Sequence, residues 1–401
     1  MRKINTRSFK LATRSTPREV NRQIVLNLIR EFQPISRAEL ARRMNVRRAA
    51  LTVIVRELIG AGDIEETGTA VSARGRRPTL IRLRTSGRLA IAVDVRQSQT
   101  TVALTDYAGH ILQESTFSTP ADSSQLGEQI VSAIKSVAAE QPVSDEGDGI
   151  RGVGIVVPGM VDRRNGRVLY APRLGWRDVP LRDAIADQIS MPVYVESAPI
   201  ACALAKLWRV SRTRTVNNFV YVSISDGVGV GIVNRGEVLR GETHTAGEFG
   251  HVSLDPNGPL CACGRHGCWE AFASNSATVA RYAGSPAARR KTPPTVEEIV
   301  RRAMLGESAA RDAIIETGHQ VGRGLAAVVA AINPKRIYIG GEVTGAWEII
   351  EGPIREELVK NTLTEAARQT PVYHDEKTEL YRMLGAVALV AAPGFAAPRV
   401  G

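Results

Sequence analysis

The chain has no apolar run of about 18 residues, the minimum length of a membrane-spanning helix. Its first 17 residues, MRKINTRSFKLATRSTP, are basic and lack the apolar stretch of a signal peptide. Short repeats and low-complexity tracts are also missing. Hydrophobic residues make up 43% of the chain and charged residues 23%, which excludes a disordered or fibrous protein. We therefore expect a cytoplasmic protein without a membrane partner, and the length of 401 residues predicts two or three domains.

Cysteine is scarce as well, and its placement is informative. The chain has four cysteines, and Cys261, Cys263 and Cys268 follow His251 in the spacing His-x9-Cys-x-Cys-x4-Cys. Three thiolates and one imidazole suit a closed, tetrahedral zinc site. The alternatives are ordinary buried thiols or a disulfide, but cysteines one residue apart pair poorly and cytosolic thiols stay reduced. The spacing therefore favours zinc, bound by these four residues.

Excess positive charge is confined to the N-terminal part of the chain. The net charge is +11, and residues 1–84 contain 19 Lys and Arg against 7 Asp and Glu, a balance of +12. Residues 85–401 carry a balance of −1. A basic module joined to a neutral body predicts a polyanion-binding domain, with nucleic acid as the first candidate and a membrane surface as a distant second. A solvated face is the alternative for any cluster of like charges.

The hydrophobic spacing within the basic module predicts three helices. The first covers residues 17–32, the second starts at a capping box formed by Ser36 and Glu39, and the third covers residues 46–59. Two helices joined by a tight turn, the second with arginines near its start, are typical of a helix-turn-helix whose recognition helix enters the major groove. The candidates for DNA contacts on this helix are Arg47, Arg48, Thr52 and Arg56.

Two short strands around a basic loop are predicted next, within residues 63–84, and they complete a winged helix-turn-helix. The loop contains Arg74, Arg76 and Arg77. Because narrow minor grooves attract guanidinium groups, we predict that these arginines contact DNA there. A solvated linker to the next domain is the alternative. We place the DNA-binding domain and its basic linker at residues 1–84.

The rest of the chain alternates predicted strands and helices, which is typical of an α/β fold. A first α/β lobe is expected over residues 85–198 and a second over residues 199–383, with the apolar helix near 384–401 rejoining the first lobe. Two related lobes that face a cleft are the predicted architecture.

Several motifs follow the helix-turn-helix in a fixed order: VVPGMVD, APRLGW, PVYVE, DGVGVGI, GEFGH, CACGRHGCWE and NPKRIYIGGEV. In this order they resemble the ROK family of repressors, open reading frames and sugar kinases, and specifically its DNA-binding repressor branch. The resemblance implies an actin-like ATPase fold of two α/β lobes, a sugar site in the cleft, a structural zinc and an N-terminal winged helix-turn-helix.

The chain departs from the family's kinases at two positions. Where the kinases have the phosphate loop Asp-x-Gly-Gly-Thr, Asp94 is followed by Val95, Arg96 and Gln97, whose side chains fill space that phosphate would need. Where the kinases have an Asn-Asp pair whose aspartate acts as the base, this chain has Ser197 and Ala198. We therefore expect no enzymatic activity, with an active sugar kinase as the less favoured alternative.

The resemblance retains half of the sugar site. Glu248, His251 and Glu270 match family residues that bind sugar hydroxyls, while Ser197 occupies the opposite side. One nitrogen of His251 is expected to bind zinc while the other faces the cleft. In the alternative interpretation, Glu248 and Glu270 only support the zinc loop.

Together these patterns predict a transcriptional regulator, most simply a repressor of carbohydrate transport or catabolism genes. Its expected partners are a double-stranded DNA operator, a carbohydrate effector and further copies of the chain, as a homodimer or homotetramer. The alternative is a regulator with a vestigial cleft, which is constitutive or controlled by a protein partner.

Overall fold

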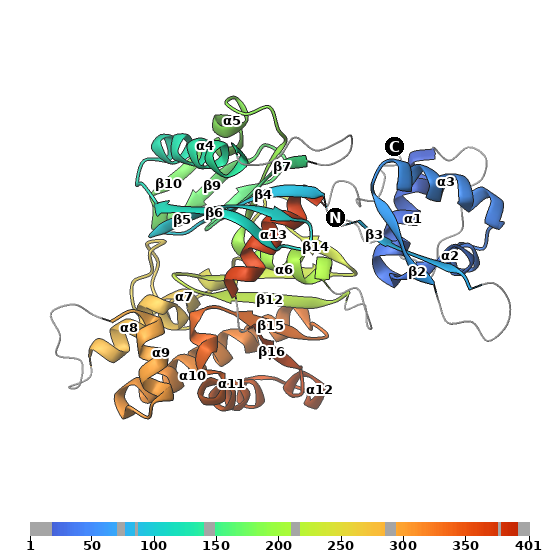
Figure 1. The fold of residues 1–401 in the computed structure, drawn as a ribbon. Coiled ribbons are helices and arrows are strands. Elements are labelled where there is room, and N and C mark those ends of the chain that lie inside the picture. Colours follow the sequence, from blue (N-terminus) through green and yellow to red (C-terminus); the bar gives the residue numbers. More distant parts are fainter. Residues whose placement is uncertain are drawn as a thin grey trace.

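The computed structural model describes residues 18–69, 77–84, 87–139, 149–209, 217–284, 294–375 and 378–391 (Figure 1). Two of the arginines predicted in the wing loop, Arg74 and Arg76, lie outside the described residues, as does the C-terminal part of the expected last helix at 392–401. Within the described residues, no helix combines the length and the apolar character needed to cross a membrane.

The N-terminal domain is a three-helix unit with a small sheet. Its elements are α1 (Arg18–Phe32), β1 (Ile35–Ser36), α2 (Arg37–Met44), α3 (Arg48–Gly60), β2 (Ile64–Thr69) and β3 (Thr79–Leu83). The strands pair antiparallel in the order β1-β3-β2, so β2 and β3 form the wing. One hydrophobic core joins the helices to the sheet through residues such as Ile29, Leu40 and Val55. This is the arrangement of a winged helix-turn-helix.

Local capping explains where the helices of this domain begin and end. The Ser36 hydroxyl accepts a hydrogen bond from the backbone N–H of Glu39 at 3.2 Å and starts α2, while the Glu39 carboxylate pairs with Arg42 and Arg43. Asn45 adopts the left-handed conformation that ends α2 (φ 54°). The next helix starts at Arg48, two residues later than the periodicity predicts.

Two five-stranded sheets with the same strand order form the body of the molecule. The first contains β4 (Arg88–Val95), β5 (Gln99–Asp106), β6 (Ile111–Ser118), β7 (Gly149–Val157) and β11 (Val193–Ser197), in the order β11-β7-β4-β5-β6. The second contains β12 (Phe219–Ile224), β13 (Val228–Asn234), β14 (Glu237–Leu239), β15 (Ile337–Gly340) and β16 (Val372–His374), in the order β14-β13-β12-β15-β16. In each sheet a single strand, β5 in the first and β13 in the second, runs antiparallel to the other four. This repeat matches the two-lobed actin-like fold that the family resemblance implies.

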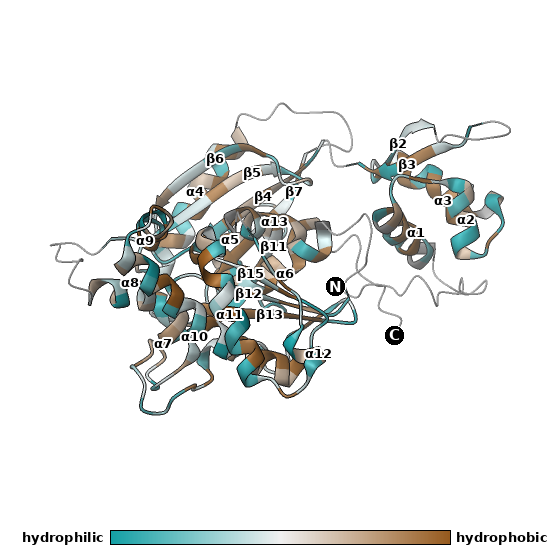
Figure 2. Ribbon diagram, turned by 90° about the horizontal axis from the view of Figure 1, so that it is seen from below, coloured by the Kyte–Doolittle hydropathy of each residue, from teal (hydrophilic) through white to brown (hydrophobic). Residues whose placement is uncertain are grey.

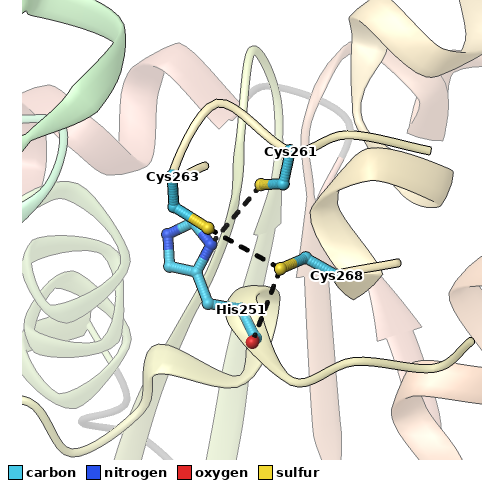
Figure 3. A group of neighbouring side chains, drawn as sticks. All are labelled: His251, Cys261, Cys263 and Cys268. Atoms are coloured by element: carbon cyan, nitrogen blue, oxygen red, sulfur yellow. Dashed lines mark hydrogen bonds between the residues drawn. The ribbon is translucent and has the colours of Figure 1, made fainter. Parts of the chain in front are cut away.

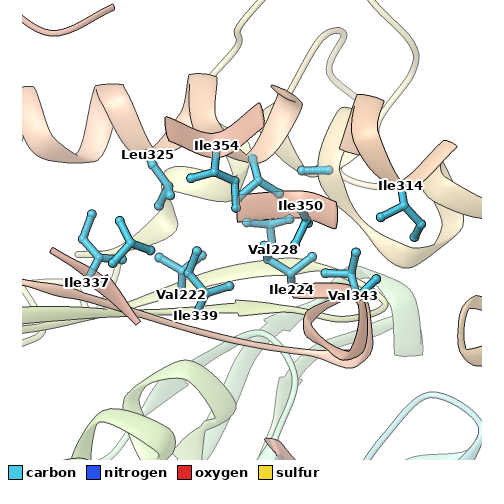
Figure 4. Packing of buried hydrophobic residues seen from close by; sticks show 14 of the residues in the cluster. Val222, Ile224, Val228, Ile314, Leu325, Ile337, Ile339, Val343, Ile350 and Ile354 are labelled. Carbon is cyan, nitrogen blue, oxygen red and sulfur yellow. The ribbon is translucent and has the colours of Figure 1, made fainter. Parts of the chain in front are cut away.

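Helices cover the outer face of each sheet. In the first lobe these are α4 (Ser123–Ala139) and α5 (Leu181–Ala186), next to a small antiparallel sheet of β8 (Met160–Asp162), β9 (Arg167–Ala171) and β10 (Trp176–Val179). In the second lobe they are α7 (Trp269–Ala273), α8 (Asn275–Ala283), α9 (Val296–Met304), α10 (Ser308–Ile332) and α11 (Trp347–Asn361), followed by the short α12 (Glu365–Arg368). Figure 4 shows Leu325 of α10 and Ile354 of α11 facing Val222 and Ile339 of the sheet.

Two helices, α6 (Ala198–Arg209) and α13 (Thr378–Ala391), pack against each other between the two sheets. α13 packs on β4 and β7 of the first sheet, and α6 packs on β12 and β13 of the second. Strand β4 turns its small residues, Ala90 and Ala92, towards α13 and its larger residues towards α4. Figure 2 shows the corresponding concentration of hydrophobic residues on the central strands.

The last helix begins at Thr378, six residues before the apolar segment that predicts it. Arg382 explains the difference, because this arginine interrupts the apolar pattern although it is itself buried in the helix. A buried arginine can be stable inside a protein when a carboxylate pairs with it, and Asp94 at the end of β4 supplies that carboxylate.

The contact between α13 and the first sheet is close enough to require glycine at position 154. A Cβ atom there would overlap the backbone carbonyl oxygen of Ala386. Gly154→Ala is therefore expected to displace α13 and to lower the free energy of unfolding by about 1–3 kcal/mol, as overpacking of a core usually does. The measurement is denaturant unfolding followed by circular dichroism. Gly352→Ala on α11 is the matched control, because a Cβ atom there meets nothing within 4 Å. Equal stability of the two variants would contradict the described packing.

Candidate functional site

A cavity of about 110 Å³ lies between the two lobes. Three of the four predicted ligand-binding residues, Glu248, His251 and Glu270, line it. The fourth, Ser197, is buried at the end of β11 and is not among the lining residues, whereas its neighbours Ala198 and Pro199 are. Glu248, His251 and Glu270 therefore lie together at the cavity. At the position expected for Ser197, the first turn of α6 lines the cavity instead.

The predicted metal ligands form one compact cluster (Figure 3). His251 Nδ1 lies 3.7 Å from Cys261 Sγ, and Cys263 Sγ lies 3.7 Å from Cys268 Sγ. All four ligand atoms lie within 4.8 Å of one another. A tetrahedral site with Zn–S bonds of about 2.3 Å has sulfur–sulfur edges of about 3.8 Å. The donor set and its spacing thus fit a single metal ion.

A buried tryptophan anchors the end of this loop. Trp269, between Cys268 and Glu270, is almost fully buried and donates a hydrogen bond from Nε1 to the backbone oxygen of Gln320 on α10 at 2.9 Å. Gly324 leaves the space for the indole, because a Cβ atom there would overlap the ring. The metal cluster and the carboxylate of Glu270 are consequently held against the core of the second lobe.

The two carboxylates in the cavity have different environments. Glu270 Oε2 accepts a hydrogen bond from the backbone N–H of Val228 at 3.1 Å, and Arg173 lies 3.4 Å from its Oε1. Glu248 lies in the short 3-10 helix η2 (Glu248–His251), where burial and the nearby charge of Glu270 raise its pKa to about 7. A carboxyl group that is partly protonated near neutral pH can both donate and accept hydrogen bonds, which suits a hydroxyl-bearing ligand.

An arginine cluster occupies the end of β4, where the sequence lacks the phosphate-loop glycines. Arg382 of α13 pairs with Asp94 at 2.5 Å, and Arg96 pairs with the same carboxylate at 3.0 Å. Arg96 also reaches Glu342 of the second lobe at 3.4 Å. Burial alone would raise the pKa of Asp94, but the charges and hydrogen bonds of Arg382 and Arg96 outweigh it and lower the pKa below its ordinary value.

Further ion pairs connect the lobes around the cavity. Arg173 follows β9 in the first lobe and contacts Glu270 in the second. Arg240, at the end of β14, pairs with Glu196 of β11 at 2.7 Å. Arg96 is recognisable from the sequence as a departure from the kinases, whereas the roles of Arg173 and Arg382 are not. Arg382 has no local signal, because it lies 288 residues from its partner Asp94. Arg173 lies within the APRLGW motif, but its partner Glu270 is 97 residues away.

Comparison with known sequences places this geometry in a family. Residues 90–392 match the ROK family. The chain belongs to the ROK family. A xylose repressor of Caldicellulosiruptor bescii is 27% identical over 387 residues, which cover 93% of this chain and 96% of that protein. The DNA-binding transcriptional dual regulator NagC of Escherichia coli is 27% identical over 380 residues, which cover 93% of this chain and 92% of that protein.

Solved ROK structures show the same fold. A ROK family transcriptional regulator, described as a homologue of the Escherichia coli MLC protein, is 28% identical with a TM-score of 0.77, and the match covers 94% of this chain and 97% of that one. A ROK family glucokinase from Streptomyces griseus, solved with glucose and AMPPNP, is 27% identical with a TM-score of 0.67. The glucokinase match covers 98% of that chain but 75% of this one. The regulator therefore matches this ROK protein over more of its length than the kinase does.

The helix-turn-helix of this ROK protein presents an exposed face on α3. Arg47, Arg48 and Arg56 are exposed, while Thr52 is half-buried and donates a hydrogen bond to the Arg48 carbonyl at 2.8 Å. Arg47 is the N-cap residue and makes no side-chain capping hydrogen bond. Val53 is 52% exposed between them. The sequence does not indicate this exposure, because an apolar residue in a helix is normally assigned to the core. Arg77, the described arginine of the wing loop, is exposed.

The buried pair of Asp94 and Arg382 generates a stability prediction. Asp94→Asn leaves the Arg382 guanidinium buried without its counter-charge and is expected to lower the free energy of unfolding by about 3–5 kcal/mol. Because the pKa of Asp94 is lowered in the folded state, its stabilisation is present above the unfolded-state pKa and is lost as the pH falls through the folded-state pKa. Urea unfolding at pH 7 and near pH 3 measures both effects.

Asp312→Asn on α10 is the control, because this carboxylate is exposed and its removal is expected to change stability by less than about 0.5 kcal/mol. A small effect of Asp94→Asn at pH 7, or one that does not shrink in acid, would contradict the role given to the pair.

Proposed function

We propose that this ROK protein is a DNA-binding transcriptional repressor of carbohydrate transport or catabolism genes, released by a sugar or sugar derivative in the interlobe cavity. The observation that carries the proposal is the combination, in one chain, of a winged helix-turn-helix with a cavity lined by Glu248, His251 and Glu270. The similarity to a xylose repressor and to NagC supports it. We assign DNA binding to residues 1–84 and the two lobes of the ROK domain to residues 85–198 and 199–383, with α13 rejoining the first lobe.

Sugar phosphorylation is not expected of this chain. The guanidinium groups of Arg96 and Arg382 lie around Asp94, at the place that the family's kinases leave open for phosphate. Ala198 replaces the residue that acts as the base in those kinases and has no group that accepts a proton. An active kinase remains the competing function, and release of ADP in the presence of ATP and a hexose would establish it.

We assign the metal cluster to zinc and give it a positioning role. With Nδ1 of His251 beside Cys261, zinc would be bound by this nitrogen and by the three thiolates of Cys261, Cys263 and Cys268. The second imidazole nitrogen is then left for the cavity, and the metal holds the ring in one orientation and tautomer. Glu248, Glu270 and His251 would bind hydroxyl groups of the sugar, and Ser197 would shape the opposite side from behind Ala198.

DNA binding is assigned to α3 and the wing. Arg47, Arg48, Thr52 and Arg56 would contact bases or phosphates in the major groove, and the exposed Val53 would contact a thymine methyl group. The wing loop with Arg74, Arg76 and Arg77 would enter the minor groove. A homodimer or homotetramer would present two such domains to a roughly palindromic operator.

Operator binding and its release by sugar test the function directly. A duplex enriched from a random library by the wild-type protein is titrated by fluorescence anisotropy at about 0.15 M salt, because the affinity of a protein for DNA depends strongly on the salt concentration. Arg48→Ala is expected to weaken binding about 5- to 150-fold, the loss of one base or phosphate contact. Arg311→Ala, an exposed arginine on α10, is the control and should bind as the wild type does.

D-xylose and N-acetyl-D-glucosamine are then added with other monosaccharides, because similar proteins are named a xylose repressor and an N-acetylglucosamine repressor. Glu270→Gln should bind the operator normally and fail to respond to the active sugar, because it loses the charged acceptor in the cavity. If the protein binds its selected duplex no better than random DNA, the proposed repressor function is refuted. Sequence-specific binding with no response to any sugar would favour a vestigial cavity with a protein partner or constitutive binding.

Metal content gives an independent prediction. Elemental analysis of the purified protein is expected to find about one zinc per chain, since a structural zinc site contributes to folding. Cys263→Ala should lose the metal and melt at a lower temperature. Cys202→Ala removes the buried cysteine outside the cluster and should keep the metal. A metal-free wild type that is as stable after chelator treatment as before would refute the site.

A further inference from the structure

Helix α6 joins the cavity to the DNA-binding domain. Ala198 and Pro199 in its first turn line the cavity, and Trp208 in its last turn packs against the hydrophobic core of the N-terminal domain. The helix has 12 residues, which corresponds to about 18 Å at about 1.5 Å per residue. One short, rigid element therefore contacts both candidate sites, and Figure 1 shows α6 in the centre of the molecule between the lobes.

The cavity end of α6 is tightly enclosed. A Cβ atom at Gly229 of β13 would lie 2.8 Å from Cγ of Pro199, and one at Gly231 would overlap the Pro199 carbonyl oxygen. From the other side, a Cβ atom at Gly385 of α13 would overlap the Ala201 carbonyl oxygen. Close-packed interiors transmit displacement instead of absorbing it. A shift of β13 or of the first turn of α6 must therefore move the helix as a unit.

The other end of α6 is fixed to the DNA-binding domain through Trp208. The guanidinium carbon of Arg30, a buried residue of α1, lies 5.8 Å from the centre of the indole ring. Trp208 Nε1 donates a hydrogen bond to the carbonyl oxygen of Tyr107 at 3.3 Å. Trp208 also packs against both hydrophobic clusters that surround α6 and α13. This side chain is the point at which three cores meet.

A second contact joins the N-terminal domain to the first lobe and does not involve α6. Arg88 at the start of β4 binds Asp63 at 2.5 Å and the Ala61 carbonyl oxygen at 3.1 Å, where α3 passes into the wing. Asp63 also pairs with Arg22 of α1. These contacts come from the first sheet, whereas Trp208 comes from the helix that lines the cavity. Movement of α6 relative to β4 would thus rotate α1 and α3 about the Asp63 contact.

We infer that α6 transmits the state of the cavity to the DNA-binding domain and that Trp208 is the positioning residue through which it acts. The inference rests on the proposed repressor function. Coupling of this kind requires an element that both sites bias. α6 meets this requirement because its two ends contact the two sites through packed side chains.

A double-mutant cycle without any sugar tests the inference. Gly229→Ala pushes on Pro199 at the cavity end and is expected to change the operator affinity of the full-length protein about 5-fold or more, the low end of typical allosteric coupling. In a Trp208→Ala background the same substitution should change the affinity less than about 2-fold. Pro199→Ala, which removes the ring that packs on Gly229, provides a second cavity-end variant if Gly229→Ala does not fold.

Matched controls separate coupling from general damage. Gly284→Ala at the end of α8 meets only ordinary contacts of 3.6 Å and should leave operator affinity unchanged in both backgrounds. Trp208→Phe keeps an aromatic ring and should retain most of the Gly229→Ala effect. Thermal melts confirm that each variant is folded.

The outcomes are distinguishable from failure of the proposed function. A wild type that selects no duplex refutes the repressor itself. The role of Trp208 is refuted if the wild type binds its operator and the cavity-end substitution changes the affinity equally with Trp208 present and in the Trp208→Ala background. Where a sugar releases the operator, Trp208→Ala should still bind that sugar by calorimetry but lose the release.

Discussion

The packing of α6 against α13 between the two sheets is the constraint on which the rest of the structure depends. Each helix follows one lobe in the chain and packs on the sheet of the other. Glycines allow this close packing. A Cβ atom at Gly385 of α13 would overlap the backbone of α6, and one at Gly154 of β7 would overlap the backbone of α13. The crossing sets the separation of the lobes, forms one wall of the cavity and directs the end of α6 towards the DNA-binding domain.

Charge plays a different role on the two sides of the cavity. On the side of β4, Asp94 is surrounded by Arg96 and Arg382, so the group is neutralised internally. On the side of the metal cluster, Glu248 and Glu270 lie close together with one arginine nearby, and burial and repulsion raise the pKa of Glu248 to about 7. A site with this division suits a neutral ligand with several hydroxyl groups better than a nucleotide. The fold is shared with the ROK kinases, and ion pairs of Asp94 with Arg96 and Arg382 stand at the end of β4.

The metal cluster and the neighbouring Trp269 stabilise the same wall of the cavity. Trp269 inserts into the notch at Gly324, and its neighbours Cys268 and Glu270 face the cluster and the cavity. A metal ion at this place would therefore orient a cavity residue without taking part in chemistry, which agrees with a closed four-ligand set.

Features that depend on local spacing could be predicted from the sequence. The helix-turn-helix periods, the Ser36 cap, the alternating strands and the spacing of His251 with the three cysteines are all encoded within short windows, where chain geometry leaves few alternatives. The predicted starts of two helices were less accurate. The helix that begins at Arg48 lacks a side-chain cap, and Arg382 interrupts the apolar pattern of the helix that begins at Thr378. Glu248 and Glu270 were found through the family resemblance.

Only the tertiary structure decided which distant residues meet. Arg382 pairs with Asp94 across 288 residues, Arg173 reaches Glu270 across 97, and α6 links the cavity to the core of the N-terminal domain. Partner choice over such separations depends on how the sheets and helices pack, and no local period carries that information. The sequence by itself determined the elements and the group of His251 and three cysteines that could hold a metal ion, while the packing of two sheets around two crossed helices determined the cavity and its connection to the N-terminal domain.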